Sequence, residues 1–181
     1  MNIVNKLIAP ALALLLCACT EEIAQVGAPA PEIAAVDLHG EPVKLERWQG
    51  KSVFLSFWSA TCGACIAEMP HLEALSREYR GKVEVVAINI DPGQESLQPI
   101  LERQGVSFPV VRDSLGMTRE RYLVVGTPTA FMIDADGILK GPCACTARKI
   151  AWYDMRLNAS RCADSSHQSA KGASNAACSA S

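Results

Sequence analysis

Between residues 33 and 141, short apolar runs alternate with segments whose apolar residues recur every three or four positions. The clearest example begins at the run 53–58, which has the length and the β-favouring composition of a buried central strand. The segment that follows carries apolar residues at helical spacing, namely Ile66, Met69, Leu72, Leu75 and Tyr79. The pattern therefore predicts a buried strand followed directly by an amphipathic helix.

The same two periodicities predict the other elements of the chain. A hairpin is expected over 33–45 with its turn at His39 and Gly40, and further strands at 83–90, 108–111, 129–133 and 138–140. Helices are expected over 96–104 and 118–123, with Gly81 and Gly105 as helix stop signals. Strands first alternate with helices and then form an antiparallel hairpin, so we predict an α/β fold with a mixed central sheet flanked by helices.

Composition narrows the functional classes. The net charge is −2 and there is no basic stripe, so we expect no nucleic-acid partner. Of the eight cysteines, two precede residue 20, two are Cys62 and Cys65, and four follow Gly141. This uneven distribution differs from that of a small disulfide-stapled scaffold, and it singles out the central pair.

Cys62 and Cys65 are spaced as Cys-x-x-Cys, after a predicted strand and on the first turn of a predicted helix. Free N–H groups and the helix dipole stabilise a thiolate at this position, and the thiolate is the form that attacks disulfides. We predict that Cys62 is the exposed nucleophile and that Cys65 resolves the mixed disulfide. The alternative is half of a structural zinc site completed by Cys143 and Cys145, which is unusual at an apolar strand–helix junction.

The chain is expected to begin with a targeting segment over residues 1–19. Lys6 precedes an apolar run that is too short to span a bilayer, and the segment ends at Cys19 after the small residue Ala18. This resembles a bacterial lipoprotein signal, in which Cys19 is acylated and anchors the protein to a membrane. An ordinary cleaved signal or a short uncleaved anchor is the alternative. Export would place the thiols in a compartment where disulfides form, here expected to be the periplasm.

Residues 20–32 are expected to be a tether, residues 33–141 the folded domain, and residues 142–181 an atypical tail rich in Cys, Ser and Ala. The last twenty or so residues of the tail have the composition of disordered segments. We interpret the tail as an altered C-terminus rather than as a thiol-rich extension that binds a soft metal such as Cu(I).

In their order and spacing, the motifs of the folded domain resemble the exported thioredoxin-like proteins of the TlpA/ResA type, relatives of the cytochrome c maturation thioredoxins. The motifs are Asp37-Leu-x-Gly-x-x-Val-x-Leu45, Phe57-Trp58, Cys62-x-x-Cys65 followed by Ala67-Glu-Met-Pro70, Gly105-Val-x-Phe-Pro-Val110, Gly126-Thr-Pro-Thr129 and Phe131-x-Ile-Asp-x-x-Gly137. The resemblance implies a thioredoxin-like fold with an N-terminal hairpin. It also implies a closing C-terminal helix, which is expected to be atypical or incomplete because the family pattern is lost after Gly141.

The resemblance also implies roles for individual residues. Pro128, after Thr127, is implied to form a cis peptide bond in a loop that faces the dithiol and binds an incoming polypeptide through its backbone. Trp58 is implied to contribute to substrate binding. Glu68, three residues after Cys65, is implied to be a catalytic acid that lies near the cysteines and disfavours the thiolate.

Three departures from the family pattern bear on the chemistry. Thr61 replaces a tryptophan often found before the first cysteine, and Ser56 stands where thioredoxin has a buried aspartate, which leaves Glu68 as the candidate proton acceptor. Gly63 and Ala64 carry no charge that would hold a thiolate. Strong oxidants depend on a stabilised reduced form, so these departures favour a reductant or isomerase over an oxidant.

The leading hypothesis is a membrane-tethered thiol–disulfide oxidoreductase that reduces protein disulfides outside the cytoplasm. It needs no cofactor and no metal beyond the redox-active Cys62–Cys65 disulfide. The resemblance implies apocytochrome c as a client and a membrane thiol-transfer protein as the source of electrons. The competing hypothesis is a copper(I) metallochaperone that uses the same two cysteines, although the histidine of copper-delivery relatives of this fold has no counterpart here.

Overall fold

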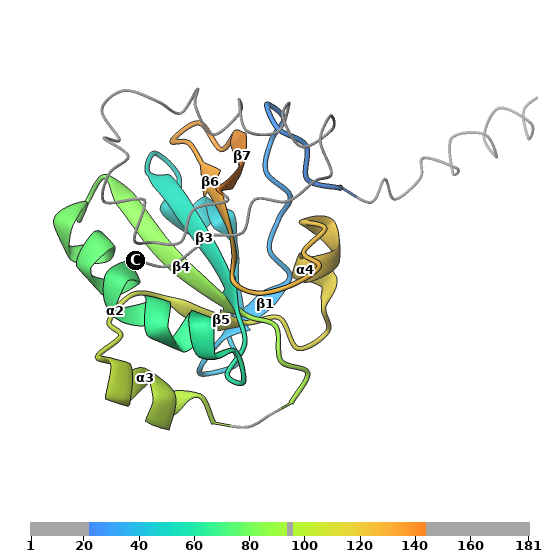
Figure 1. The fold of residues 1–181 in the computed structure, drawn as a ribbon. Helices are drawn as coiled ribbons and strands as arrows, with labels where there is room; N and C mark the ends of the chain where they lie inside the picture. Colours follow the sequence, from blue (N-terminus) through green and yellow to red (C-terminus); the bar gives the residue numbers. More distant parts are fainter. Residues whose placement is uncertain (1–21, 94–95, 144–181) are drawn as a thin grey trace, which may run out of the picture.

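The computed structural model describes residues 22–93 and 96–143, so the predictions for Cys19 and for the tail after Cys143 lie outside the described residues. The described strands form one seven-stranded sheet (Figure 1). They are β1 (Ala35–Asp37), β2 (Pro42–Val43), β3 (Ser52–Trp58), β4 (Val83–Asn89), β5 (Val110–Arg112), β6 (Thr129–Ile133) and β7 (Leu139–Cys143). The helices are the 3-10 helix η1 (Leu45–Trp48) and the α-helices α2 (Gly63–Glu78), α3 (Gln98–Gln104) and α4 (Met117–Arg121).

The sheet is mixed, as the sequence predicts. The strand order is β2-β1-β5-β4-β3-β6-β7, in which β3, β4 and β5 run parallel and the remaining neighbours pair antiparallel. Because parallel strands end at the same edge of a sheet, the carboxyl ends of β3, β4 and β5 meet there, which is where ligand and active sites of open α/β sheets form. Cys62 follows the end of β3 and lies at this edge.

Apolar side chains cover both faces of the sheet. One cluster joins alternate residues of β3 and β4, such as Phe54 and Val85, to Leu72 of α2 and Leu101 of α3. The other cluster joins Leu55, Phe57 and Val86 to residues around η1 and α4. Both faces of β3 are therefore buried, which explains its almost continuous apolar sequence. Cys65 belongs to the first of these clusters, and Cys62 packs against it.

Several boundaries differ from those predicted. Leu45 begins η1 instead of ending the hairpin, α3 begins two residues later than expected, and β5 begins at Val110 instead of Phe108. Pro109 explains the last shift, because proline has no N–H to donate to a strand ladder. The strand predicted over 138–140 continues to Cys143, two residues beyond the expected end of the domain.

Both outer strands of the sheet contain a proline. Pro42 lies in the two-residue strand β2, and Pro142 lies in β7 opposite Phe131 of β6. Proline is tolerated in edge strands because only one side of such a strand needs its N–H groups for pairing. The sequence Gly141-Pro142 therefore does not end β7.

Candidate active site

Cys62 and Cys65 form a disulfide at the N-terminus of α2. Cys62 is the N-cap residue, and its Sγ accepts a hydrogen bond from the backbone N–H of Cys65 at 3.2 Å. Cys62 is partly exposed, whereas Cys65 is 2% exposed and packs in the core beneath α2. The N-cap position directs backbone N–H groups at the outer sulfur, which favours its charged form after reduction.

The loop before β6 lies opposite the disulfide. The Thr127–Pro128 peptide bond is cis, and the carbonyl oxygen of Thr127 lies 3.7 Å from Cys62 Sγ. Thr129 Oγ1 donates to the Gly126 carbonyl at 2.7 Å, which closes the loop on itself. Residues 62 and 127, which are 65 positions apart in the chain, are therefore brought together at one edge of the sheet.

Glu68 and Trp58 lie on the buried side of the site. Glu68 is 9% exposed, on the second turn of α2. Trp58 is 2% exposed and belongs to the same apolar cluster as Cys65 and Met69. The expectation that Trp58 contributes to substrate binding therefore stays a prediction, and the structure places the side chain of this last residue of β3 beneath α2. It supports the dithiol from below.

Asp91 belongs to the site although it is not among the site residues predicted from the sequence. It follows β4, and its carboxylate accepts hydrogen bonds from Ser59 Oγ (2.6 Å), Ala60 N (2.8 Å) and Asn89 Nδ2 (2.8 Å). Burial raises the pKa of Asp91, but these hydrogen bonds and the charge of Arg112 together outweigh burial and hold the pKa below its ordinary value of 3.8. The side chain is therefore ionised at neutral pH and binds the loop between β3 and α2.

The sequence pattern of the AhpC/TSA family matches residues 26–141, which contain the disulfide, the cis-proline loop and all seven strands except the last two residues of β7. The chain belongs to the AhpC/TSA family. Its relatives show that it is a thiol–disulfide oxidoreductase with a thioredoxin-like fold, which confirms the predicted fold and the predicted class of reaction.

Known proteins similar to this AhpC/TSA family member carry the same activity in their names. The chain is 36% identical over 118 residues to the thiol-disulfide oxidoreductase ResA of Bacillus thuringiensis subsp. konkukian, which covers 65% of this chain and 68% of the relative. It is 37% identical over 116 residues to ResA of Geobacillus kaustophilus, covering 64% and 67%. The crystal structure of a protein described as the thiol:disulfide interchange protein DsbE of Chlorobium tepidum superposes with a TM-score of 0.66 at 31% identity, covering 75% of this chain and 97% of that structure.

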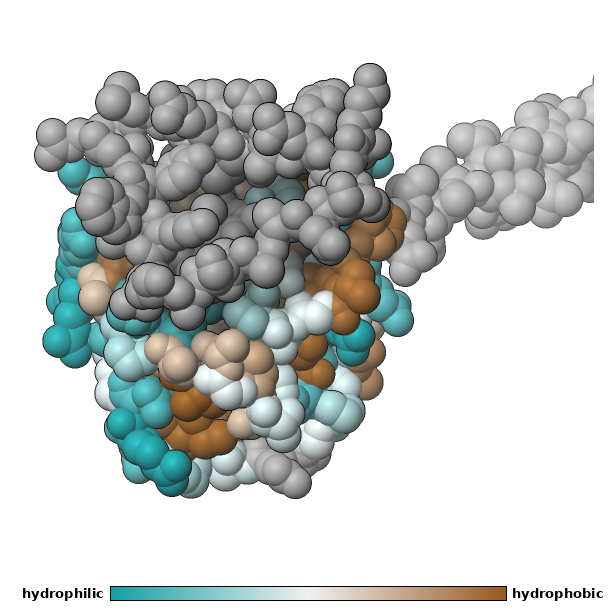
Figure 2. All heavy atoms as spheres, in the orientation of Figure 1, coloured by the Kyte–Doolittle hydropathy of each residue, from teal (hydrophilic) through white to brown (hydrophobic). Residues whose placement is uncertain are grey.

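Exposed apolar side chains gather beside the cis-proline loop of this family member. Leu123 and Val125, which lead into that loop, are 62% and 92% exposed, and Leu115 and Met117 at the start of α4 are also exposed. Figure 2 shows this apolar surface in brown at the right, in the region of α4. The residues that lead from α4 into the cis-proline loop therefore expose apolar side chains.

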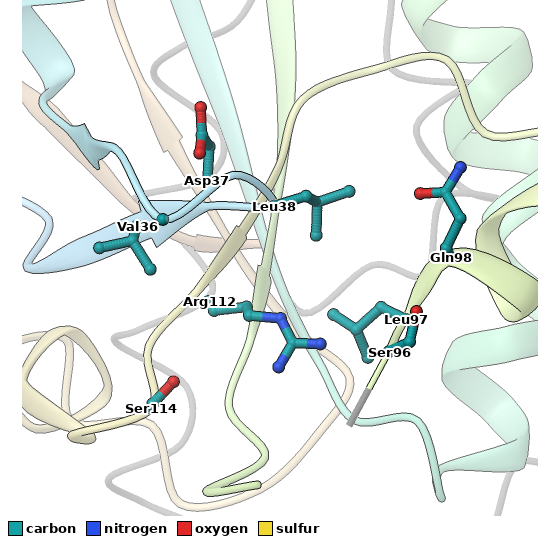
Figure 3. A pocket seen from close by; sticks show the side chains of 9 residues that line it. Val36, Asp37, Leu38, Ser96, Leu97, Gln98, Arg112 and Ser114 are labelled. Carbon is teal, nitrogen blue, oxygen red and sulfur yellow. The ribbon is translucent and has the colours of Figure 1, made fainter. Parts of the chain in front are cut away.

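A cavity of about 380 Å³, lined by both polar and apolar residues, lies at the same edge of the sheet, and neither Cys62 nor Cys65 lines it. Figure 3 shows Arg112, at the end of β5, directed towards Leu97 and Ser96. Among residues 22–93 and 96–143, no three His, Cys, Asp or Glu side chains are grouped closely enough to hold a metal ion. Within the same ranges, no helix has both the length and the apolarity needed to cross a membrane.

Proposed function

We propose that this oxidoreductase reduces disulfides of client proteins outside the cytoplasm, with Cys62 as the nucleophile and Cys65 as the resolving thiol. The observation that carries the proposal is the unequal exposure of the two sulfurs at the N-terminus of α2. A client can reach the partly exposed Cys62, whereas Cys65, at 2% exposure, can reach only its neighbour.

The reaction would proceed in two exchanges. In the reduced protein, the Cys62 thiolate attacks one sulfur of a client disulfide, and the other client sulfur leaves as a thiolate that takes up a proton. Cys65 then loses its proton and attacks Cys62 Sγ, which releases the second client thiol. Two electrons pass to the client, and the protein is left with the Cys62–Cys65 disulfide. A membrane thiol-transfer protein would restore the dithiol.

Thr127 and Pro128 would hold the client, and Glu68 would exchange a proton with the dithiol. The 3.7 Å separation between the Thr127 carbonyl and Cys62 supports this role, because an extended client segment that binds the loop backbone would have its sulfur beside Cys62. Glu68 lies one turn after Cys65 on α2 and is largely buried. A carboxylate in such a position disfavours a nearby thiolate.

We expect the dithiol to be a reductant. No cation lies between the two cysteines in the sequence, and the carboxylates of Glu68 and Asp91 lie in the same region, so the reduced form gains no electrostatic stabilisation beyond that of the helix N-terminus. Equilibration with glutathione buffers, followed by mass spectrometry of the peptide that carries both cysteines, should give a potential of about −200 to −270 mV. A potential close to that of strong oxidants, about −120 mV, would reverse the proposed direction.

We propose further that Cys19 is lipidated and that the protein is tethered to a membrane, where apocytochrome c is a client. The apolar segment that ends at Ala18-Cys19 supports the anchor, and the resemblance to TlpA/ResA-type proteins supports the client. When both proteins are expressed in a bacterium, labelled palmitate should enter the wild type and should not enter the Cys19→Ala variant. Equal labelling of both proteins would exclude Cys19 as the lipidation site.

A further inference from the structure

The turn that leads into Cys62 is built on a network of polar contacts that begins at Asp91. Ser59 Oγ, which donates to Asp91, also lies 2.9 Å from Thr61 Oγ1 and accepts a hydrogen bond from Thr61 N at 3.2 Å. Cys62 N donates to the Ser59 carbonyl at 3.1 Å, which closes the turn. Each residue from Ser59 to Cys62 is thus connected to the Asp91 carboxylate directly or through one intermediate residue.

Asp91 is itself fixed by the sheet. Ile90 N donates to the Trp58 carbonyl at 3.0 Å, so the pairing of β3 and β4 continues up to the residue before Asp91. Asn89 is 1% exposed and donates its amide to Asp91, while its Oδ1 has no hydrogen-bond partner among the described residues. A buried acceptor without a partner costs free energy. The amide keeps this orientation because only its Nδ2 group can donate a hydrogen bond to the Asp91 carboxylate.

We propose that Asp91 is a positioning residue for disulfide exchange, which fixes the turn from Ser59 to Cys62 and thereby holds Cys62 within reach of Cys65 when the disulfide is reduced. The inference rests on the exchange reaction proposed for these two cysteines. In the oxidised protein the covalent bond keeps the sulfurs together, whereas in the reduced protein only the turn and the start of α2 do so.

The loss of Asp91 should have two physical effects, and both favour the reduced dithiol over the disulfide. A looser turn lowers the effective concentration of one thiol near the other, which weakens the disulfide relative to the dithiol. Removal of the carboxylate also takes away a negative charge that disfavours the thiolate, which stabilises the reduced form. Both effects shift the equilibrium with glutathione towards the dithiol, and the first also slows release of a mixed disulfide by Cys65.

The test compares Asp91→Asn with Asp134→Asn. Asp134 accepts hydrogen bonds from Asp136 N (3.0 Å) and Ile138 N (2.8 Å) and pairs with Lys140 at 2.6 Å, and it follows β6 at the end of the sheet opposite the disulfide. Like Asp91, it is a carboxylate held by several polar contacts, but its contacts lie away from the loop that carries the dithiol. In glutathione buffers, Asp91→Asn should shift the ratio of dithiol to disulfide roughly three- to tenfold towards the dithiol, whereas Asp134→Asn should leave it unchanged.

Ser59→Ala provides a second variant that keeps the carboxylate and removes only the shortest hydrogen bond. It should shift the ratio in the same direction by a smaller factor, and Ser59→Thr, which retains the hydroxyl, should restore it. Ser107→Ala is its control, because that hydroxyl donates to Glu73 at 2.7 Å on a later turn of α2. If the wild type exchanges with glutathione and the Asp91 and Ser59 variants match it, Asp91 has no positioning role. If the wild type does not exchange at all, the proposed function itself is wrong.

Discussion

Replacing Cys62 by serine should reduce disulfide exchange to the uncatalysed rate, whereas replacing Cys65 by serine should yield a protein that attacks once and remains attached to its client. The difference follows from exposure, because Cys62 is partly exposed and Cys65 is 2% exposed. Without Cys62, the buried thiol cannot reach a client sulfur. Without Cys65, the mixed disulfide on Cys62 has no internal thiol to resolve it.

Insulin reduction and mass spectrometry of covalent adducts measure the two outcomes. Cys65→Ser should accumulate adducts whose linkage maps to Cys62, and the captured proteins would name the clients. The double variant Cys62→Ser/Cys65→Ser is the control for adducts formed by the cysteines after Gly141. Adducts of equal yield in Cys62→Ser and Cys65→Ser would contradict the assigned order of attack.

Replacing Phe57 by alanine should cause the largest loss of stability. The Phe57 ring contacts Tyr122 and Phe131 with centroid distances of 5.6 and 5.8 Å, and Tyr122 and Phe131 are 5.2 Å apart. The side chain is fully buried on the face of β3 that packs against the residues after α4. Removing it should lower the free energy of unfolding by about 3 to 5 kcal/mol. A domain of this size has only about 5 to 15 kcal/mol in total, so the variant should be close to unfolding.

Urea denaturation followed by circular dichroism would measure this loss. Val125→Ala is the control, because Val125 is 92% exposed and its truncation should change the unfolding free energy by no more than about 0.5 kcal/mol. A loss below about 1 kcal/mol for Phe57→Ala would mean that the aromatic cluster rearranges to fill the space.

Much of the fold could be predicted because local patterns specify it. The apolar runs of β3, β4 and β6 and the helical spacing in α2 are each contained in one short segment, and Cys-x-x-Cys marks the start of α2 directly. The Asp91 contacts could not be predicted in this way, since Ser59 and Asp91 are 32 residues apart and meet only when β3 and β4 pair. The sequence signal for these contacts was an acidic residue shortly after β4, the strand that pairs with β3.

The position of Trp58 shows the opposite limitation. The Phe57-Trp58 motif indicates the right strand, but it does not state which face each residue occupies. In β3, Phe54 and Trp58 share the face covered by α2, whereas Leu55 and Phe57 lie on the face that packs against Tyr122 and Phe131, and this alternation places Trp58 beneath α2. The motif therefore indicates the strand that leads to the cysteines, whereas the face occupied by Trp58 follows only from the pairing of the sheet.

The prolines of the two outer strands have a consequence for association with other chains. An edge strand with a continuous row of free N–H and C=O groups is a template for aggregation. Here β2 has two residues, one of them Pro42, and β7 is interrupted by Pro142, so neither strand offers an uninterrupted row of donors. Strand-by-strand polymerisation is therefore disfavoured at both sides of the sheet.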